Sequence, residues 1–222
     1  VDRTLQPGQG FTVAFALGLA KTKEPGTIPT LPTITEEDWS VWRRYLKEGN
    51  PSAEQQQVEF AAEKVELDLT EEDLKVTGTY FLRNRSRSSV GMGIVYPILS
   101  LPKSPAPSFI IAPNGSQIPV RINNKGQAES RFQISMAAQS LTKFQVRYTQ
   151  KHFGKRAGYM VTSALRWPTP ITRAVFVIRY PASLGRVRIS YPIAHTKKIG
   201  DQIVHTIVRN NFVPDREVEL RW

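Results

Sequence analysis

The chain has 222 residues, no cysteine, and 30 Lys and Arg against 19 Asp and Glu, which gives a formal net charge of +11. The missing cysteine excludes disulfides, thiolate nucleophiles and cysteine-ligated zinc. Apolar residues make up 40% of the chain and charged residues 22%, which is typical of a folded globular protein and excludes a disordered one.

The charge is divided unevenly along the chain. Residues 1–80 hold 8 Lys and Arg and 14 Asp and Glu, whereas residues 81–222 hold 22 Lys and Arg and 5 Asp and Glu. Such asymmetry favours an anionic partner for the basic part, or an acidic segment lying against it. A solvated basic face without a partner is the alternative.

The first apolar run, FTVAFALGLA at residues 11–20, is predicted to be a strand. It is shorter than the roughly 20 residues that a membrane-spanning helix needs, and no other apolar run is longer. Because the sequence begins at Val1 rather than at Met, we expect a processed form from which a signal peptide has been removed.

One helix is predicted, over residues 35–48. Thr35 caps it, acidic residues follow in the first turn, and Trp39 and Trp42 lie on one apolar stripe. The stripe packs on the body of the domain or, alternatively, docks a partner through the two tryptophans. A Pro-rich connector precedes the helix, so residues 21–51 have the character of an insertion.

From about residue 73 onward the apolar residues alternate with polar ones, which is the period of a β-strand. Residues 52–69 are ambiguous, because the composition of this stretch suits a helix, whereas VEF and VELDL alternate and favour a strand for its later part. Asn114-Gly115 and the stretch 123–126 are predicted to be hairpin turns. The predicted strands and hairpins cover 58–69, 74–84, 90–98, 109–122, 121–136, 142–150, 158–167, 171–180, 185–192, 202–212 and 217–222.

No helical pattern of 10–15 residues separates these strands, which disfavours a parallel sheet with helical crossovers. The sequence therefore predicts an all-β protein: a single domain over residues 1–222, built as an antiparallel β-sandwich, Ig-like or jelly-roll-like, with one accessory N-terminal helix.

Basic side chains recur on the predicted outer faces of the strands and in the loop KHFGKR, residues 151–156. Arginines on a strand are explained by the solvent side of a sheet, but neighbouring strands that align them would form an anion-binding stripe. The candidate anion-binding residues are Arg147, Lys151, Lys155, Arg156, Arg173, Arg179, Arg186 and Arg188.

Motifs of catalysis are missing from the sequence, which has no P-loop, no dinucleotide fingerprint and no nucleophile elbow. His195 and His205 flank a Lys197-Lys198 turn and could converge in a hairpin, which leaves a metal site as a minor alternative. Acidic residues concentrate in the helix and in the stretch 59–73. We predict no catalytic residue, no metal and no cofactor, and a hydrolase with an unrecognised site stays open.

Several short motifs in the second part of the chain resemble uncharacterised exported bacterial β-sandwich domains. They are VTGTYFLRNRS (76–86), Tyr96-Pro97, YMVTSALRWPTPI (159–171) and NNFVPDREVELRW (210–222). The resemblance covers residues 58–222 and implies a periplasmic or extracellular location, without implying an activity. Within these motifs we expect Trp167 and Phe212 to pack rather than to bind a ligand.

These observations predict a non-enzymatic structural or interaction protein of the bacterial cell envelope, with a basic surface for an anionic polymer or a protein partner. An intracellular nucleic-acid-binding protein is the alternative, because a net positive field attracts any polyanion. A hydrolase is the second alternative.

Overall fold

A computed structural model describes residues 11–13, 57–101, 105–124 and 126–222, and these residues are mostly in β-strands. The largest sheet has eight strands in the order β13-β14-β11-β2-β3-β9-β5-β6. Their bounds are His195–Ile199, Gln202–Phe212, Ile171–Pro181, Val58–Leu69, Asp73–Asn84, Leu141–Lys151, Phe109–Ile111 and Gln117–Pro119, in the same order.

Two smaller sheets complete the fold. A four-stranded sheet has the order β1-β4-β8-β7, with bounds Phe11–Val13, Val90–Ile98, Ala128–Met136 and Arg121–Ile122. A three-stranded sheet has the order β10-β15-β12, with bounds Arg156–Tyr159, Val218–Arg221 and Arg188–Ile189. Two 3-10 helices, η2 (Thr162–Arg166) and η3 (Ala182–Leu184), lie in the connections. In the described part of the chain, no helix is long and apolar enough to cross a membrane.

The pairing is antiparallel except between β2 and β11 and between β1 and β4, which are parallel. The all-β prediction and the antiparallel character of the sheets are therefore confirmed, and so is the hairpin at Asn114-Gly115, which joins β5 to β6. The narrower choice of an Ig-like or jelly-roll-like sandwich stays a prediction. The predicted helix at 35–48, with Trp39 and Trp42, lies outside the described residues.

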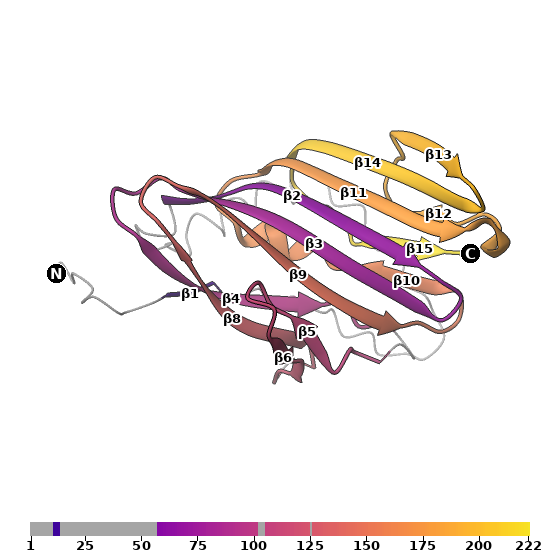
Figure 1. The fold of residues 1–222 in the computed structure, drawn as a ribbon, viewed down its shortest axis with the longest axis horizontal. Coiled ribbons are helices and arrows are strands. Elements are labelled where there is room, and N and C mark those ends of the chain that lie inside the picture. Colours follow the sequence, from indigo (N-terminus) through magenta and orange to yellow (C-terminus); the bar gives the residue numbers. More distant parts are fainter. Residues whose placement is uncertain (1–10, 14–56, 102–104, 125) are drawn as a thin grey trace.

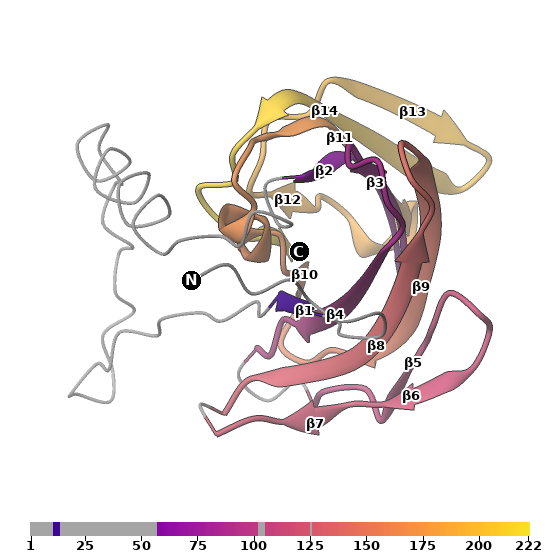
Figure 2. The same cartoon turned by 90° about the vertical axis from the view of Figure 1, so that its left-hand side faces the viewer.

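The three sheets share one hydrophobic core. The eight-stranded sheet forms a curved wall with β4, β10 and β12 on its concave side (Figures 1 and 2). Phe176 of β11, Ile98 of β4 and Leu220 of β15 are each 0% exposed and belong to the same cluster. The alternating apolar residues thus meet from three sheets, as period-two strands with one buried face require.

A β-bulge in β2 changes which residues face this core. The register between β2 and β3 shifts between Phe60 and Ala62. Before the bulge Val58 and Phe60 are buried, and after it the odd-numbered Glu63, Val65 and Leu67 are buried. A bulge inserts one extra residue and so changes the phase of the side chains. The bulge therefore places a carboxyl group, Glu63, on the core side of the largest sheet.

The prediction of strands over 158–167 and 185–192 is wrong for most of their length. β10 ends at Tyr159, and η2 occupies Thr162–Arg166, because Glu217 accepts hydrogen bonds from the backbone amides of Val161 and Thr162 at 2.6 and 3.1 Å. In the second stretch only Arg188–Ile189 pairs as a strand. A long-range carboxylate contact of this kind leaves no local pattern in the sequence.

Gly78 of β3 leaves the space that the Tyr80 ring occupies. A Cβ atom at Gly78 would overlap the Tyr80 hydroxyl, so the ring lies back along its own strand over the glycine. The ring can take this position only because residue 78 has no side chain.

We expect Gly78→Ala to lower the free energy of unfolding by about 1–3 kcal/mol, because the added methyl group displaces a buried tyrosine from a packed core. Chemical denaturation followed by tryptophan fluorescence measures this change. Gly91→Ala in β4 is the matched control, since a Cβ there would meet no atom within 4 Å. An equal effect of the two substitutions would contradict this role of Gly78.

Candidate functional site

Glu63 is the buried carboxyl group without a partner in the core. It is 4% exposed, and its Oε1 atom has no hydrogen-bond partner among the described residues. On the neighbouring strands it lies opposite Tyr80 of β3 and Ala174 of β11. A buried polar atom left unpaired costs roughly 1–3 kcal/mol, so its retention needs a reason.

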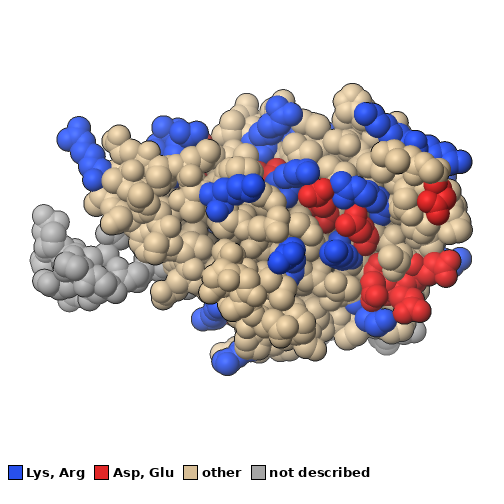
Figure 3. All heavy atoms as spheres, viewed as in Figure 1, with Lys and Arg blue, Asp and Glu red and all other residues tan. Residues whose placement is uncertain are grey.

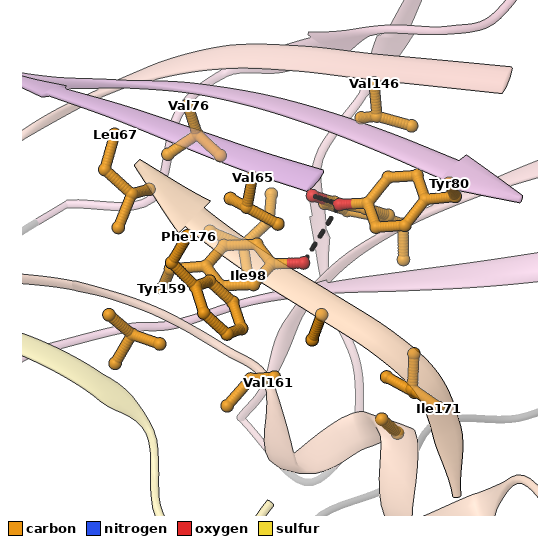
Figure 4. Packing of buried hydrophobic residues seen from close by; sticks show 14 of the residues in the cluster. Val65, Leu67, Val76, Tyr80, Ile98, Val146, Tyr159, Val161, Ile171 and Phe176 are labelled. Atoms are coloured by element: carbon orange, nitrogen blue, oxygen red, sulfur yellow. Dashed lines mark hydrogen bonds between the residues drawn. The ribbon is translucent and has the colours of Figure 1, made fainter. Parts of the chain in front are cut away.

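Three tyrosine hydroxyls meet beside Glu63. The Tyr80 hydroxyl lies 2.7 Å from that of Tyr96 and 2.9 Å from that of Tyr159. Figure 4 shows the hydroxyls of Tyr80 and Tyr159 pointing toward one another inside the apolar cluster. Because these residues belong to β3, β4 and β10, the Tyr80 hydroxyl links all three sheets.

A cavity of about 50 Å³ adjoins this cluster. A buried water needs about 10–15 Å³ of such volume, so the cavity has room for a few waters or for a ligand group of similar size. It is lined by Phe60, Glu63, Tyr80, Leu82, Ile94, Val95, Tyr96, Pro97, Phe144, Tyr159, Met160, Val161, Ser163, Ala164 and Trp167. Together these residues form the Glu63 pocket.

Trp167 supplies a second unpaired polar atom to the Glu63 pocket. Its ring is 7% exposed and packs on Phe60 with ring centroids 5.3 Å apart, which confirms the packing expected for it. The buried Nε1 has no hydrogen-bond partner among the described residues. The pocket thus combines an unpaired acceptor, Glu63 Oε1, with an unpaired donor, Trp167 Nε1.

Glu217, just before β15, positions the wall of the pocket that η2 forms. Besides the two backbone amides, its carboxylate accepts a hydrogen bond from the Thr162 hydroxyl. These bonds satisfy the amides at the start of η2, which has no capping side chain of its own. Ser163, Ala164 and Trp167 are thereby held against Glu63 and the tyrosines.

Burial controls the protonation of the pocket. It raises the pKa of the Glu63 carboxyl from 4.5 to about 8, because no positive group offsets the loss of hydration. The same cause raises the pKa values of Tyr80, Tyr96 and Tyr159. At neutral pH Glu63 is therefore mostly protonated and the tyrosines are neutral.

Two groups of the predicted anion-binding residues lie on different surfaces. Arg147 of β9 and Arg173 and Arg179 of β11 lie on the outer face of the eight-stranded sheet, where Arg179 pairs with Glu66 at 2.7 Å and Asp68 at 3.0 Å. Figure 3 shows that face, with acidic side chains lying between the basic ones. Carboxylates therefore interrupt the row of cations on this surface.

Of the remaining predicted residues, four lie on or next to the strands of the three-stranded sheet, and the fifth, Lys151, ends β9 of the eight-stranded sheet. Arg156 of β10 and Arg188 of β12 both pair in register with Arg221 of β15, so the three arginines form one row. Glu219 binds Arg156 at 3.0 Å and Arg221 at 2.7 Å. Lys155 follows Gly154 in the loop before β10, and Arg186 is exposed before β12. Lys151, at the end of β9, pairs with Glu72 at 3.1 Å and Asp73 at 3.5 Å.

His195 of β13 and His205 of β14 belong to the same hairpin, but their side chains lie on opposite faces of it. His195 lies opposite Thr206 and is exposed, whereas His205 lies opposite Thr196 and is 8% exposed. The His205 ring nitrogens contact the hydroxyls of Tyr180 at 2.9 Å and Thr196 at 2.8 Å. Within the described residues, no group of three or more metal-ligating side chains occurs.

The Glu63 pocket was not predicted from the sequence, although one signal points to it. The buried Val65, Leu67 and Leu69 alternate, and extending that alternation backwards places Glu63 on the buried face. A carboxyl group at an expected core position is the anomaly that identifies such a site. The tyrosines and Trp167 come from distant strands, and no spacing in the sequence links them to Glu63.

Comparisons with known proteins show a related fold but no family. No protein-family model and no curated protein match the chain. A structure from Legionella pneumophila, described as a "putative nutrient binding protein", superposes with a TM-score of 0.52 at 9% identity, covering 74% of this chain and 66% of that one. A zinc metallopeptidase from Deinococcus radiodurans, of the M1 class, gives a TM-score of 0.41 at 13% identity, covering 78% of this chain and 44% of the peptidase. The chain thus spans under two thirds of these proteins.

Glu63→Gln should change how stability depends on pH. Burial favours the protonated carboxyl, so the contribution of Glu63 to stability is complete below pH 4.5 and is lost as the pH rises to about 8. Glutamine stays neutral throughout. Since one pKa unit corresponds to about 1.4 kcal/mol, the variant should gain about 3 kcal/mol in free energy of unfolding relative to the wild type between pH 5 and pH 8.

Urea denaturation at several pH values measures this difference. Glu66→Gln on the outer face of the same strand is the control, because Arg179 lowers the pKa of Glu66 and the carboxylate stays charged from pH 5 to pH 8. Its stability difference from the wild type should therefore be constant over that range. A constant difference for Glu63→Gln as well would show that the Glu63 carboxyl is hydrated.

Proposed function

We propose that this domain binds a small molecule in the Glu63 pocket and does not transform it. The observation that carries the proposal is the pair of unpaired buried polar atoms, Glu63 Oε1 and Trp167 Nε1, beside a cavity in an aromatic core. Binding sites for small molecules are concave, mostly apolar and carry a few polar groups that fix the ligand. A ligand with matching polar atoms would remove the cost of leaving both unpaired.

The lining residues support binding better than catalysis. Many acid–base mechanisms pair a proton acceptor with a separate proton donor, and beside Glu63 the described lining offers tyrosines whose pKa values burial raises. The fold is shared with a protein described as nutrient-binding, which is consistent with a binding role for this chain. We extend the proposal to a periplasmic or extracellular location, which the resemblance of residues 58–222 to exported sandwich domains supports.

A screen of small polar compounds by methyl NMR tests the pocket. We expect ligands to shift the methyl signals of Leu82, Ile94 and Val161, which line it. Ala164→Met fills the cavity from η2 and should reduce the affinity at least tenfold. Ala61→Met is the control, because Ala61 faces a depression on the outer side of the sheet.

If Ala164→Met does not fold, Trp167→Phe removes the indole donor and keeps an aromatic ring. Shifts confined to the outer face, or an affinity that survives both substitutions, would refute the pocket as the binding site.

A second candidate function is binding of a polyanion at the three-stranded sheet. The in-register row of Arg156, Arg221 and Arg188 favours it, since Glu219 is the one carboxylate that forms ion pairs with this row among the described residues. Each phosphate or sulfate group bound by such a row would steepen the salt dependence of binding.

We expect Arg188→Glu with Arg221→Glu to weaken binding to heparin and to duplex DNA, and to flatten the dependence of affinity on salt by about one ion for each anionic group that the variant no longer binds. Fluorescence anisotropy across a salt series measures both. Arg147→Glu with Arg173→Glu on the outer face is the matched control for charge. Equal losses of affinity in the two double variants would show that only the net charge of the protein attracts polyanions.

A further inference from the structure

The Glu63 pocket lacks a positive charge. Of the described residues that line it, none is Lys, Arg or His, and the charged or titratable groups that face Glu63 are the tyrosines of β3, β4 and β10. Tyr148 of β9 lies behind them against Tyr96, with ring centroids 6.2 Å apart. An ionised carboxylate in such a site is costly unless a cation enters with it.

The aromatic lining attracts cations. Six rings line the pocket, and five of them are joined by ring contacts: Phe60 with Trp167 at 5.3 Å, Phe60 with Tyr80 at 6.1 Å, Tyr80 with Phe144 at 5.1 Å and Tyr80 with Tyr96 at 6.0 Å. The face of an aromatic ring carries negative potential, and a cation over it is stabilised most when the site is dry. Ring faces and a carboxyl group together select a positive ligand.

The hydrogen-bonding groups of the pocket are mostly acceptors. The three clustered hydroxyls hold three protons and six lone pairs, and the two bonds among them use two of each. Glu63, once ionised, adds acceptor positions and no donor. An ammonium group, which brings up to three donors and no acceptor, complements this excess, and an acceptor elsewhere on the same ligand is needed to pair the Nε1 donor of Trp167.

Resting on the proposed binding function, we infer that the Glu63 pocket binds an ammonium group, either a small amine or the amine end of a larger solute. The carboxylate of Glu63 is the counterion, the tyrosine hydroxyls accept hydrogen bonds, and the aromatic rings of Phe60, Phe144 and Trp167 line the space beside them. The cavity of about 50 Å³ suits a head group of this size.

Binding of a cation then requires Glu63 to lose its proton. Because burial raises the pKa of Glu63 to about 8, affinity for an amine should rise with pH up to that value, while alkylammonium ions stay charged until about pH 10. Below the pKa of Glu63 the slope approaches a tenfold gain in affinity per pH unit. A neutral or anionic ligand that accepts the Glu63 proton would show the opposite trend.

Ethylammonium, ethanol and acetate, which are similar in size, form the test panel. Their affinities are measured at pH 6, 7 and 8 from the methyl signals of Leu82, Ile94 and Val161 in the wild type, in Glu63→Gln and in Glu66→Gln. We expect ethylammonium to bind at least tenfold more tightly than the other two at pH 8, with an affinity that increases from pH 6. Glu63→Gln should lose this preference, and Glu66→Gln should keep it.

Three results would overturn the inference. Preferential binding of ethanol or acetate at the pocket methyls would refute the ammonium ligand and leave the small-molecule pocket intact. Ethylammonium binding that Glu63→Gln does not weaken would show that the carboxyl is not the counterion. Absence of binding by every compound, including those of the wider screen, would refute the pocket function as well.

Discussion

The fold depends on how one carboxyl group, Glu63, is accommodated where three sheets meet. The bulge in β2 turns it inward, and the hydroxyl of Tyr80 joins Tyr96 and Tyr159 next to it. Each hydroxyl comes from a different sheet, so the polar centre fixes how the sheets pack as well as what the core encloses. An apolar residue at position 63 would remove the cost of burial, so the carboxyl at this position is consistent with the proposed binding role.

Distant segments supply the support for this centre. Gly78 leaves room for the Tyr80 ring, and Glu217 holds η2 and with it Trp167 against Phe60. These contacts hold the walls of the Glu63 pocket in place and leave the cavity between them open. A ligand would therefore enter a site that is already formed, which limits the ordering cost of binding.

Much of the architecture followed from the alternation of apolar residues. The buried faces of β3, β9 and β11 are those that the pattern assigns, and Arg186 and Arg188 are exposed against the buried Val187. The Glu63 pocket could not be predicted from this alternation. It depends on the bulge in β2, on Gly78 beneath the Tyr80 ring, and on the Glu217 carboxylate that binds the start of η2. Such features join residues far apart in sequence, and periodicity carries no information about them. The predicted basic surface is divided between two sheets, since strand order decides which arginines become neighbours.

The charge state of Glu63 is the central claim, and its direct measurement is the carboxyl chemical shift in a protein labelled with ¹³C at glutamate, titrated from pH 4 to pH 10. The account predicts a midpoint near 8 in the free protein, since burial without a cation raises the pKa of Glu63 to about 8. Saturating ethylammonium should lower that midpoint. A midpoint near the ordinary value of 4.5, unchanged by the amine, would show that the carboxyl is solvated and would contradict both the pocket and its proposed ligand.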